Sequence, residues 1–218
     1  MGVSLIIPPG CRICSDGPPA DMQKDRELLG RSFFEQEPTR CARELVGCGL
    51  EGKGCAGLIV ETEAYEAEGD AACHTHARPS ARLFIAEHEA GTAYVYLNYG
   101  MHWLFNLLVK GGEKNGFVLV RALEPLRGLP LMRRRRGRKE QGDLCSGPGK
   151  LTQALGIEGN LHGVAVLASR AFALWRPGDE KKAEPLACRR VGISSAVSRK
   201  WRFVREGSPF LSVAPGRE

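Results

Sequence analysis

Apolar and polar or small residues alternate over residues 57–65, which together with the β-branched content predicts a β-strand. Three apolar and aromatic stretches, residues 92–99, 102–109 and 117–123, predict further strands. Gly100 and Met101 separate the second from the third, and the turn-like KGGEKNG separates the third from the fourth. Such short connections join antiparallel neighbours, so we expect a hairpin meander. Two later strands are predicted over residues 163–169 and 201–213.

Helix signals lie between and after these strands. The predicted helices cover residues 39–46, 125–136 and 149–155. Thr39 is a candidate N-cap for the first, which Gly47 would end. Pro125 would open the second, and Gly156 would end the third. The pattern predicts an α+β fold: a single domain on a curved, mainly antiparallel sheet with a protruding β-hairpin and peripheral helices.

The division of the chain follows from its composition. Residues 1–25 are rich in Gly, Pro and polar residues and are expected to form a loosely ordered lead-in. No repeat or low-complexity linker follows, so residues 26–218 are expected to form one domain. The start of the chain lacks a signal peptide pattern, and no apolar run reaches the roughly 18 residues of a membrane span. We therefore expect a cytoplasmic protein with reduced thiols and no membrane association.

The charge balance favours an anionic partner. The 31 Lys and Arg residues exceed the 25 Asp and Glu residues, which gives 31 − 25 = +6 and a pI of about 9.0. Nucleic acid is the first candidate, and an ordinary basic protein is the alternative. Of eight cysteines, Cys11 and Cys14 form the one close pair, and a zinc site needs a second pair nearby. We therefore expect no metal.

Candidate chemistry begins in the stretch IVETEAY, residues 59–65. Strict alternation would place Ile59, Glu61, Glu63 and Tyr65 on one face of the strand. Arg121 lies in the apolar run FVLVRAL, and burying a guanidinium is costly unless it is paired. We expect Arg121 to pair with one of the two glutamates. A carboxylate kept ionised in this way is suited to activating a water molecule.

The stretch YVYLNYGMHW, residues 94–103, is unusually aromatic. Tyr94 and Tyr96 share one strand face and Tyr99 falls on the other. Such rings can stack on nucleobases, although aromatic residues are also simply good strand formers. Asn106 follows in the apolar run LFNLLV and needs a hydrogen-bond partner if buried.

Two basic segments are candidate phosphate contacts. The run RRRRGRK at 133–139 contains Arg134 and Arg135, and it is either a DNA backbone contact or a solvated surface. The segment SGPGKL places Ser146, Gly147 and Lys150 at the start of a predicted helix, where free N–H groups can hold a phosphate. Its spacing is not that of a P-loop.

Six segments in this order resemble the alkyladenine DNA glycosylase family, also called mammalian-type 3-methyladenine DNA glycosylase. They are VETEAY (60–65), DAACH (70–74), YVYLNYGMHWLFN (94–106), VRALEPL (120–126), LCSGPGKL (144–151) and RFVREGSP (202–209). The resemblance implies a base-excision repair enzyme that flips alkylated or deaminated purines out of duplex DNA. The lesions are of the 3-methyladenine, 7-methylguanine, hypoxanthine and ethenoadenine type. Hydrolysis of the N-glycosidic bond by a Glu-activated water would leave an abasic site.

The resemblance also implies roles for single residues. Glu63 matches the catalytic glutamate, and Arg121 matches its partner in holding the attacking water. Tyr65, His74 and Tyr96 match the residues that enclose the flipped base. The family needs no cofactor, and we expect a monomer, associated with the nucleoid in a bacterium or nuclear in a eukaryote.

Two further roles and one departure complete the resemblance. Asn106 matches the residue that crowds the 2-amino group of guanine, and Tyr99 matches the side chain that enters the minor groove. The family usually carries an Arg-Asn step and then Met-Phe before the hairpin. Here Ser80 stands where that Asn would fall. The DNA contacts of the 75–91 segment therefore differ from the family pattern.

Two alternatives remain open from the residues alone. A sugar glycosidase could use Glu61 and Glu63, whose spacing of about 6.7 Å along a strand lies near the lower edge for inverting enzymes. A nucleic-acid-binding module of the same fold could bind duplex DNA without cutting it. Such a module would leave a glutamate beside Arg121 in an aromatic pocket without a role.

Overall fold

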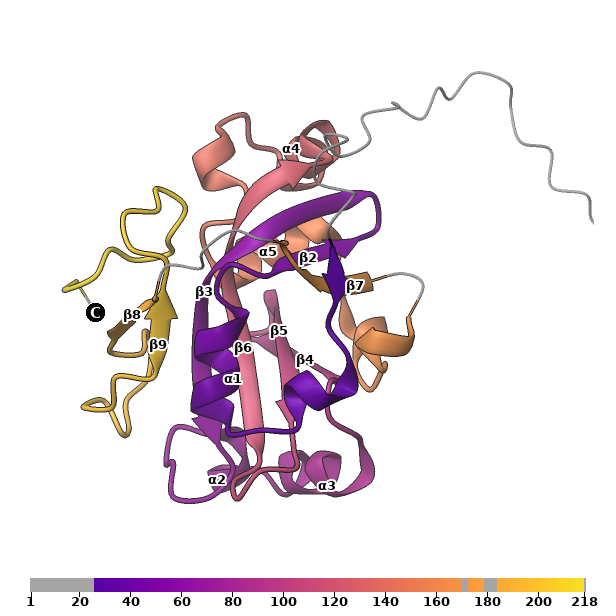
Figure 1. Ribbon diagram of the computed structural model, residues 1–218. Coiled ribbons are helices and arrows are strands. Elements are labelled where there is room, and N and C mark those ends of the chain that lie inside the picture. The colour runs from indigo at the N-terminus through magenta and orange to yellow at the C-terminus, as the bar shows by residue number, and fades with distance from the viewer. Residues whose placement is uncertain (1–25, 170–171, 179–183, 218) are drawn as a thin grey trace, which may run out of the picture.

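The structure is a computed structural model that describes residues 26–169, 172–178 and 184–217 (Figure 1). The strands in these ranges are β1 Glu27–Leu28, β2 Gly49–Gly52, β3 Cys55–Glu66, β4 Ala93–Asn98, β5 His102–Val109, β6 Gly116–Arg127, β7 Phe172–Arg176, β8 Leu186–Cys188 and β9 Arg202–Val204. The α-helices are α1 Pro38–Leu45, α2 His74–Ala77, α3 Pro79–Glu87, α4 Leu129–Arg136 and α5 Pro148–Leu155. Short 3-10 turns cover Arg31–Phe34, Gln141–Asp143, Gly159–Leu161 and Val166–Ala168. The predicted α+β class is confirmed.

All strand pairs in the described ranges are antiparallel, and the sheet branches at β3. Its main path runs β1-β7-β2-β3-β6-β5-β4. One edge of β3 pairs with β6 along its length, whereas the other edge pairs first with β2 and then, from Glu61 to Glu63, with β9. This branch brings the C-terminal part of the chain against the centre of β3 (Figure 1).

Three register shifts interrupt the β3–β6 ladder, and two of them are β-bulges beside the glutamates. The register places one extra residue, Val60, on β3, and one extra residue, Arg121, on β6. Each bulge reverses the alternation of side chains on its strand. Val60 is the extra residue of the bulge between Ile59 and Glu61, so these two side chains do not share a face, and that expectation is wrong. Ile59 belongs to the main hydrophobic core.

The helices cover the sheet and close its ends. α1 packs on β3 and contributes Cys41, Ala42 and Leu45 to the main core. α2 and α3 lie at one end of the long strands and α4 at the other (Figure 1). A second cluster, which includes Phe84, Tyr94 and Phe117, forms a separate aromatic core beside Tyr65 and Tyr96. No described helix has both the length and the apolar character needed to cross a bilayer.

The predicted meander is confirmed as β4, β5 and β6, and two predicted helices are confirmed as α1 and α5. The N-cap assignment is wrong, because α1 begins at Pro38 and Thr39 lies inside its first turn. Residues 75–91, in which no helix was expected, contain most of α2 and all of α3.

The prediction that Pro125 opens a helix is also wrong. Pro125 remains in β6 opposite Gly57, and α4 begins four residues later, after Gly128 with φ of 77°. β5 pairs with β6 only through Leu119, so the missing N–H of Pro125 costs no bond to β5.

The two late strands are largely absent from their predicted positions. Ala165 forms a single bridge with Thr92, and a 3-10 turn follows. A short buried apolar run does not distinguish strand from other structure by periodicity. In the range 201–213 the strand is limited to β9, after which Gly207, with φ of 73°, turns the chain. The lead-in over 1–25, with Cys11 and Cys14, lies outside the described residues.

Candidate active site

A cavity of about 700 Å³ opens between the β4–β5 hairpin, the start of α5 and the loop after β8. Its lining includes eight residues predicted from the sequence: Tyr65, His74, Tyr96, Tyr99, Asn106, Arg121, Gly147 and Lys150. These residues span 86 positions of the chain (150 − 65 + 1), and the branched sheet brings them together.

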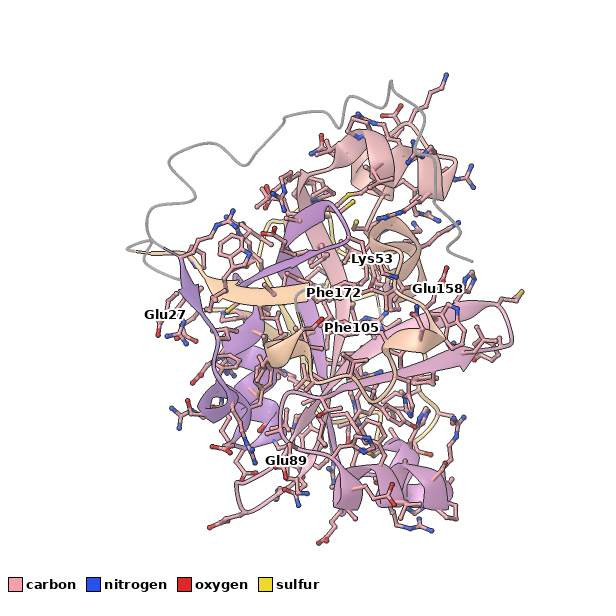
Figure 2. The ribbon with its side chains drawn as sticks, turned by 90° about the vertical axis from the view of Figure 1, so that its right-hand side faces the viewer. Glu27, Lys53, Glu89, Phe105, Glu158 and Phe172 are labelled. Atoms are coloured by element: carbon pink, nitrogen blue, oxygen red, sulfur yellow. The ribbon has the colours of Figure 1, made fainter. Side chains whose placement is uncertain are left out.

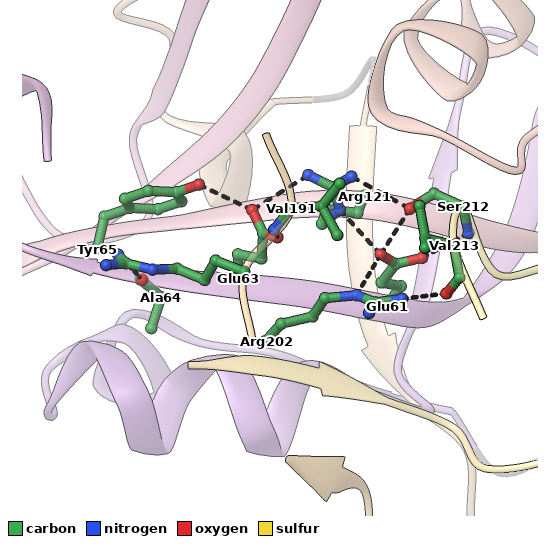
Figure 3. A network of polar contacts seen from close by, with 10 residues as sticks. Glu61, Glu63, Ala64, Tyr65, Arg121, Val191, Arg202, Ser212 and Val213 are labelled. Carbon is green, nitrogen blue, oxygen red and sulfur yellow. Dashed lines mark hydrogen bonds and ion pairs between the residues drawn. The ribbon is translucent and has the colours of Figure 1, made fainter. Parts of the chain in front are cut away.

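Glu63 is fully buried behind the cavity wall and accepts three hydrogen bonds within the described structure (Figure 3). Tyr65 Oη donates to Glu63 Oε2 at 2.8 Å, and Arg121 Nη1 donates to the same oxygen at 3.1 Å. The backbone N–H of Val191 donates to Oε1 at 2.7 Å. Tyr65 and Arg121 also line the cavity, so they connect it directly to the carboxylate.

Glu61 is equally buried but is surrounded by more donors (Figure 3). Its Oε1 accepts from Arg121 Nε at 2.8 Å, Arg202 Nε at 2.7 Å and Ser212 Oγ at 2.7 Å. Its Oε2 accepts from the Ser212 backbone N–H at 2.6 Å. Glu61 therefore accepts four hydrogen bonds, one more than Glu63. The expected pairing of Arg121 with the strand glutamates is confirmed, and it involves both of them.

The bulge at Arg121 explains how one guanidinium reaches two carboxylates. Arg121 is the extra residue on β6, and bulges commonly redirect a side chain next to a site. Its third nitrogen, Nη2, donates to Ser212 Oγ at 3.1 Å. Burial would lower the pKa of Arg121, but Glu63 and Glu61 raise it above its ordinary value, so it is a permanent cation.

Neighbouring groups determine the protonation states of Glu61 and Tyr65 in this network. Burial would raise the pKa of Glu61, but Arg121, Arg202 and the Ser212 hydrogen bonds outweigh it and lower that pKa. Burial, and then the Glu63 carboxylate, hold the pKa of Tyr65 well above its ordinary value. Tyr65 is therefore a neutral donor to Glu63.

The aromatic wall of the cavity is built from the β4–β5 hairpin and α2. The His74 and Tyr96 ring centroids lie 4.4 Å apart, and His74 Nδ1 lies 3.1 Å from Tyr94 Oη. Tyr94 stacks on Phe117 of the aromatic core at 4.4 Å. Burial and then Arg78 lower the pKa of His74 to about 4, so the ring is neutral at physiological pH.

The side-chain amide of Asn106 is hydrogen-bonded within this wall. Its Nδ2 donates to the carbonyl of Tyr94 at 3.1 Å, and the residue is buried. Asn106 also lines the cavity, so it presents a rigid polar edge to whatever enters.

The hairpin tip protrudes from the sheet and carries exposed apolar side chains (Figure 2). Tyr99 is 82% exposed and Met101 is 71% exposed. Tyr99 has φ of 51°, in the left-handed region that non-glycine residues rarely adopt. Strained backbone at a loop tip is often maintained for function.

The chain is similar to a defined family over most of its length. The family profile described as Methylpurine-DNA glycosylase (MPG) matches residues 32–209. The chain belongs to the methylpurine-DNA glycosylase family.

Several bacterial relatives are similar over nearly the whole chain. A protein of Nitrobacter winogradskyi named "Putative 3-methyladenine DNA glycosylase" is 41% identical over 92% of this chain and 93% of its own length. Proteins with the same name from Rubrobacter xylanophilus and Agrobacterium fabrum are each 42% identical, over 80% and 84% of this chain and 91% of their own lengths. The chain is a DNA N-glycosylase of the DNA repair type, so the sugar glycosidase and the non-catalytic module are set aside.

The basic residues of this DNA glycosylase differ in their surroundings. Arg134 is exposed on α4. Arg135 donates to the carbonyls of Ala154 and Lys53 at 2.9 and 3.1 Å, so its guanidinium caps the end of α5. Arg136, which was not predicted, lines the cavity.

The start of α5 faces the cavity through its predicted residues. Gly147, with φ of 152°, and Lys150 line the cavity, whereas Ser146 is not part of its lining. Lys150 Nζ donates to Asp143 Oδ1 at 2.5 Å and to Ser146 Oγ at 3.3 Å. Of the predicted phosphate contacts, Gly147 and Lys150 thus line the same cavity as Arg136.

Several site residues were missed from the sequence. The loop 191–195 lines the cavity, Ser212 completes the Arg121 network, and Arg190 pairs with Asp70 in the interior. Arg190 lies in a segment without strand or helix periodicity, whereas Ser212 lies in the stretch 201–213 that was predicted as a strand and carried no signal for a site. Asp70 lies in the matched segment DAACH, which was the one available signal.

Proposed function

We propose that this DNA glycosylase removes alkylated or deaminated purines, of the 3-methyladenine, 7-methylguanine, hypoxanthine and ethenoadenine type, from double-stranded DNA. The observation that carries the proposal is the Glu63–Arg121 pair directly behind an aromatic cavity. A cavity of about 700 Å³ is in the size range of small-molecule sites, and a purine nucleoside is of that class.

Glu63 is the proposed general base that activates the attacking water. A carboxylate has about four acceptor positions, and the described neighbours of Glu63 occupy three. The remaining position on Oε1 would accept a hydrogen bond from water, which Arg121 would help to orient. Glu61 accepts four hydrogen bonds, one more than Glu63, and two arginines and Ser212 hold it, which favours Glu63 as the base.

The proposed reaction follows from these charges. Cleavage of the glycosidic bond develops positive charge on the sugar, which the Glu63 carboxylate would stabilise while it takes a proton from water. The purine leaves with the bonding electrons, and hydroxide adds to the anomeric carbon. A base alkylated at N3 or N7 is already cationic and leaves with little help.

Tyr65, His74 and Tyr96 are the proposed walls around the flipped base. Electron-rich ring faces attract a cationic base by roughly 0.5–2 kcal/mol. A neutral His74 adds no repulsion to such a base, and the lowered pKa supports this state. Asn106 is proposed to exclude guanine, because its amide is fixed on Tyr94 and cannot move away from the 2-amino group.

Tyr99 is the proposed wedge that replaces the flipped base in the duplex. Wedges at protruding tips offset an unstacking cost of a few kcal/mol. Contacts with the DNA backbone are proposed for Arg134, Arg135, Ser146, Gly147 and Lys150, with Arg135 the weakest candidate because its guanidinium already caps α5.

A monofunctional reaction is proposed, in which water and no lysine attacks the sugar. Lys150 is the lysine that lines the cavity within the described residues, and its ammonium donates to Asp143. A protonated, ion-paired amine is not a nucleophile. We further propose a monomer that acts in the cytoplasm, at the nucleoid of a bacterium, because one chain builds the whole cavity.

The test uses a duplex with a single hypoxanthine or ethenoadenine, incubated with the protein and then treated with alkali. The proposal predicts strand breaks at the lesion after alkali and intact strands without it. Breaks without alkali would contradict the monofunctional reaction, and no release of either base would contradict the lesion range.

A further inference from the structure

Four side chains stack behind the cavity wall in the order Tyr65, Arg190, Trp201 and Arg199. The Arg190 guanidinium carbon lies 4.7 Å from the Tyr65 ring centroid and 5.3 Å from the Trp201 ring centroid. Arg199 lies over Trp201 at 4.2 Å. The first of these rings, Tyr65, forms part of the cavity lining.

Arg190 is also one half of a buried ion pair. Its Nη1 and Nη2 donate to the two carboxylate oxygens of Asp70 at 2.6 and 2.8 Å, and both side chains are 0% exposed. Nη1 donates in addition to the carbonyl of Ala64 on β3 at 3.0 Å. Arg190 therefore ties the loop before His74 to the strand that carries Glu63.

Two neighbours of Arg190, Tyr65 and Val191, donate to the two oxygens of the Glu63 carboxylate (Figure 3). Val191, the next residue in the chain, donates its backbone N–H to Glu63 Oε1 at 2.7 Å. Tyr65, whose ring lies against Arg190, donates its hydroxyl to Glu63 Oε2 at 2.8 Å. A shift of Arg190 would move two of the three donors to Glu63.

We propose that Arg190 is a positioning residue for glycosidic hydrolysis, which holds the Val191 N–H and the Tyr65 hydroxyl against Glu63. This inference rests on the proposed role of Glu63 as the general base. A buried ion pair often stabilises a fold no more than a well-packed apolar pair would. The presence of the Arg190–Asp70 pair beside the site therefore favours a geometric role for it.

The proposal has a consequence for the pH dependence of the rate. Donors to a carboxylate favour its ionised form, so loss of the Val191 and Tyr65 bonds would weaken that preference. The acidic limb of the pH–rate profile would then move to higher pH. The charged and titratable groups that face Glu63 are Glu61, Tyr65, Tyr96, Arg121, Arg190 and Arg202.

The test compares Arg190→Lys with Arg199→Gln as the matched control. Lysine keeps the charge but cannot make the two-pronged bond to Asp70. Arg199 belongs to the same stack and bonds to the carbonyl of Gly69, but has no described contact with Asp70, Tyr65 or Glu63. Single-turnover excision of hypoxanthine is measured against pH and enzyme concentration, at matched folded fraction.

Arg190→Lys should lower the maximal rate by about 10- to 100-fold, since misplacing a reacting group by 1 Å can cost about 10²-fold. The enzyme concentration that gives half of the maximal rate should change little. The acidic limb of the pH–rate profile should move to higher pH. Arg199→Gln should leave rate and limb unchanged. If Arg190→Lys fails to fold, Trp201→Leu, which removes one ring from Arg190, should move the limb in the same direction.

An unmoved acidic limb in folded Arg190→Lys or Trp201→Leu would overturn the proposal, as would equal effects of Arg190→Lys and Arg199→Gln. Glu63→Gln, measured in the same assay, distinguishes a failure of the role of Arg190 from a failure of the proposed role of Glu63. If Glu63→Gln is inactive and the Arg190 variant behaves as wild type, only the role of Arg190 fails. If Glu63→Gln is active, the proposed general base itself fails.

Discussion

Glu61 and Glu63 lie two residues apart on β3, yet their surroundings suit them to different tasks. Glu61 accepts four hydrogen bonds and neutralises Arg202 and part of Arg121, so its charge is committed to structure. Glu63 shares Arg121 but accepts three hydrogen bonds, two of them from residues that line the cavity. The sequence motif selects Glu63, and its direct contacts with the cavity-lining Tyr65 and Arg121 favour the same choice.

The lowered pKa of His74 predicts a pH-dependent stability. The folded value of about 4 lies below the ordinary 6.5, so the unfolded chain binds the proton more readily. The free energy of unfolding should therefore fall as the pH drops from about 6.5 toward 4. His74→Gln should reduce this slope in urea unfolding followed at several pH values. An unchanged slope would show that His74 is not the group responsible.

Asn106 predicts a change in base selection. Asn106→Ala removes the amide that is fixed on the Tyr94 carbonyl and opens space in the cavity wall. The variant should release normal guanine slowly from undamaged duplex, which wild type should not do. Free guanine is measured by chromatography after long incubation. No release from a folded variant that still excises hypoxanthine would assign Asn106 a structural role.

At the scale of elements, the β4–β5 hairpin predicts a difference between duplex and single-stranded substrates. Tyr99→Ala should weaken binding to a lesion in duplex DNA much more than to the same lesion in a single strand, because a wedge only replaces a flipped base. Met101→Ala, at the same exposed tip, is the matched control. Equal losses on both substrates, or equal losses for both variants, would contradict the wedge role.

Helix α4 predicts a change in salt dependence. Arg134 is exposed, whereas Arg135 is engaged with α5, so the two should separate binding from stability. Arg134→Ala should reduce the slope of log K against log salt by about 0.9, the contribution of one phosphate contact. Arg135→Ala should instead lower the thermal unfolding midpoint. An unchanged slope for Arg134→Ala would show that the basic run at 133–139 is a solvated surface and no DNA contact.

The elements differ in how well the sequence predicts them. Turn residues and runs rich in apolar, β-branched and aromatic residues predict β3 to β6, and most residues of these strands are buried. Alternation does not predict the bulges at Val60 and Arg121, since an extra residue depends on the partner strand. Those bulges separate Ile59 from the glutamate face and direct Arg121 to both carboxylates.

At the scale of the whole molecule, the branched sheet assembles the site. β3 supplies the two glutamates, β6 supplies Arg121, and β9 brings the C-terminal segment with Ser212 to the same place. The sequence motif identified the residues of β3, β6 and the hairpin. It did not identify Arg190 or Ser212, because their roles come from contacts across more than 90 residues of chain.

The most direct test of the account is single-turnover excision of hypoxanthine by Glu63→Gln and Glu61→Gln, compared at matched folded fraction. Glu63→Gln keeps the size of the side chain and removes its charge. It should bind a lesion duplex nearly as wild type does and lose at least about 10²-fold in rate, as expected for a lost general base. Glu61→Gln should act mainly through stability and lose much less. An inactive Glu61→Gln beside an active Glu63→Gln would contradict the account and place the water at the other carboxylate.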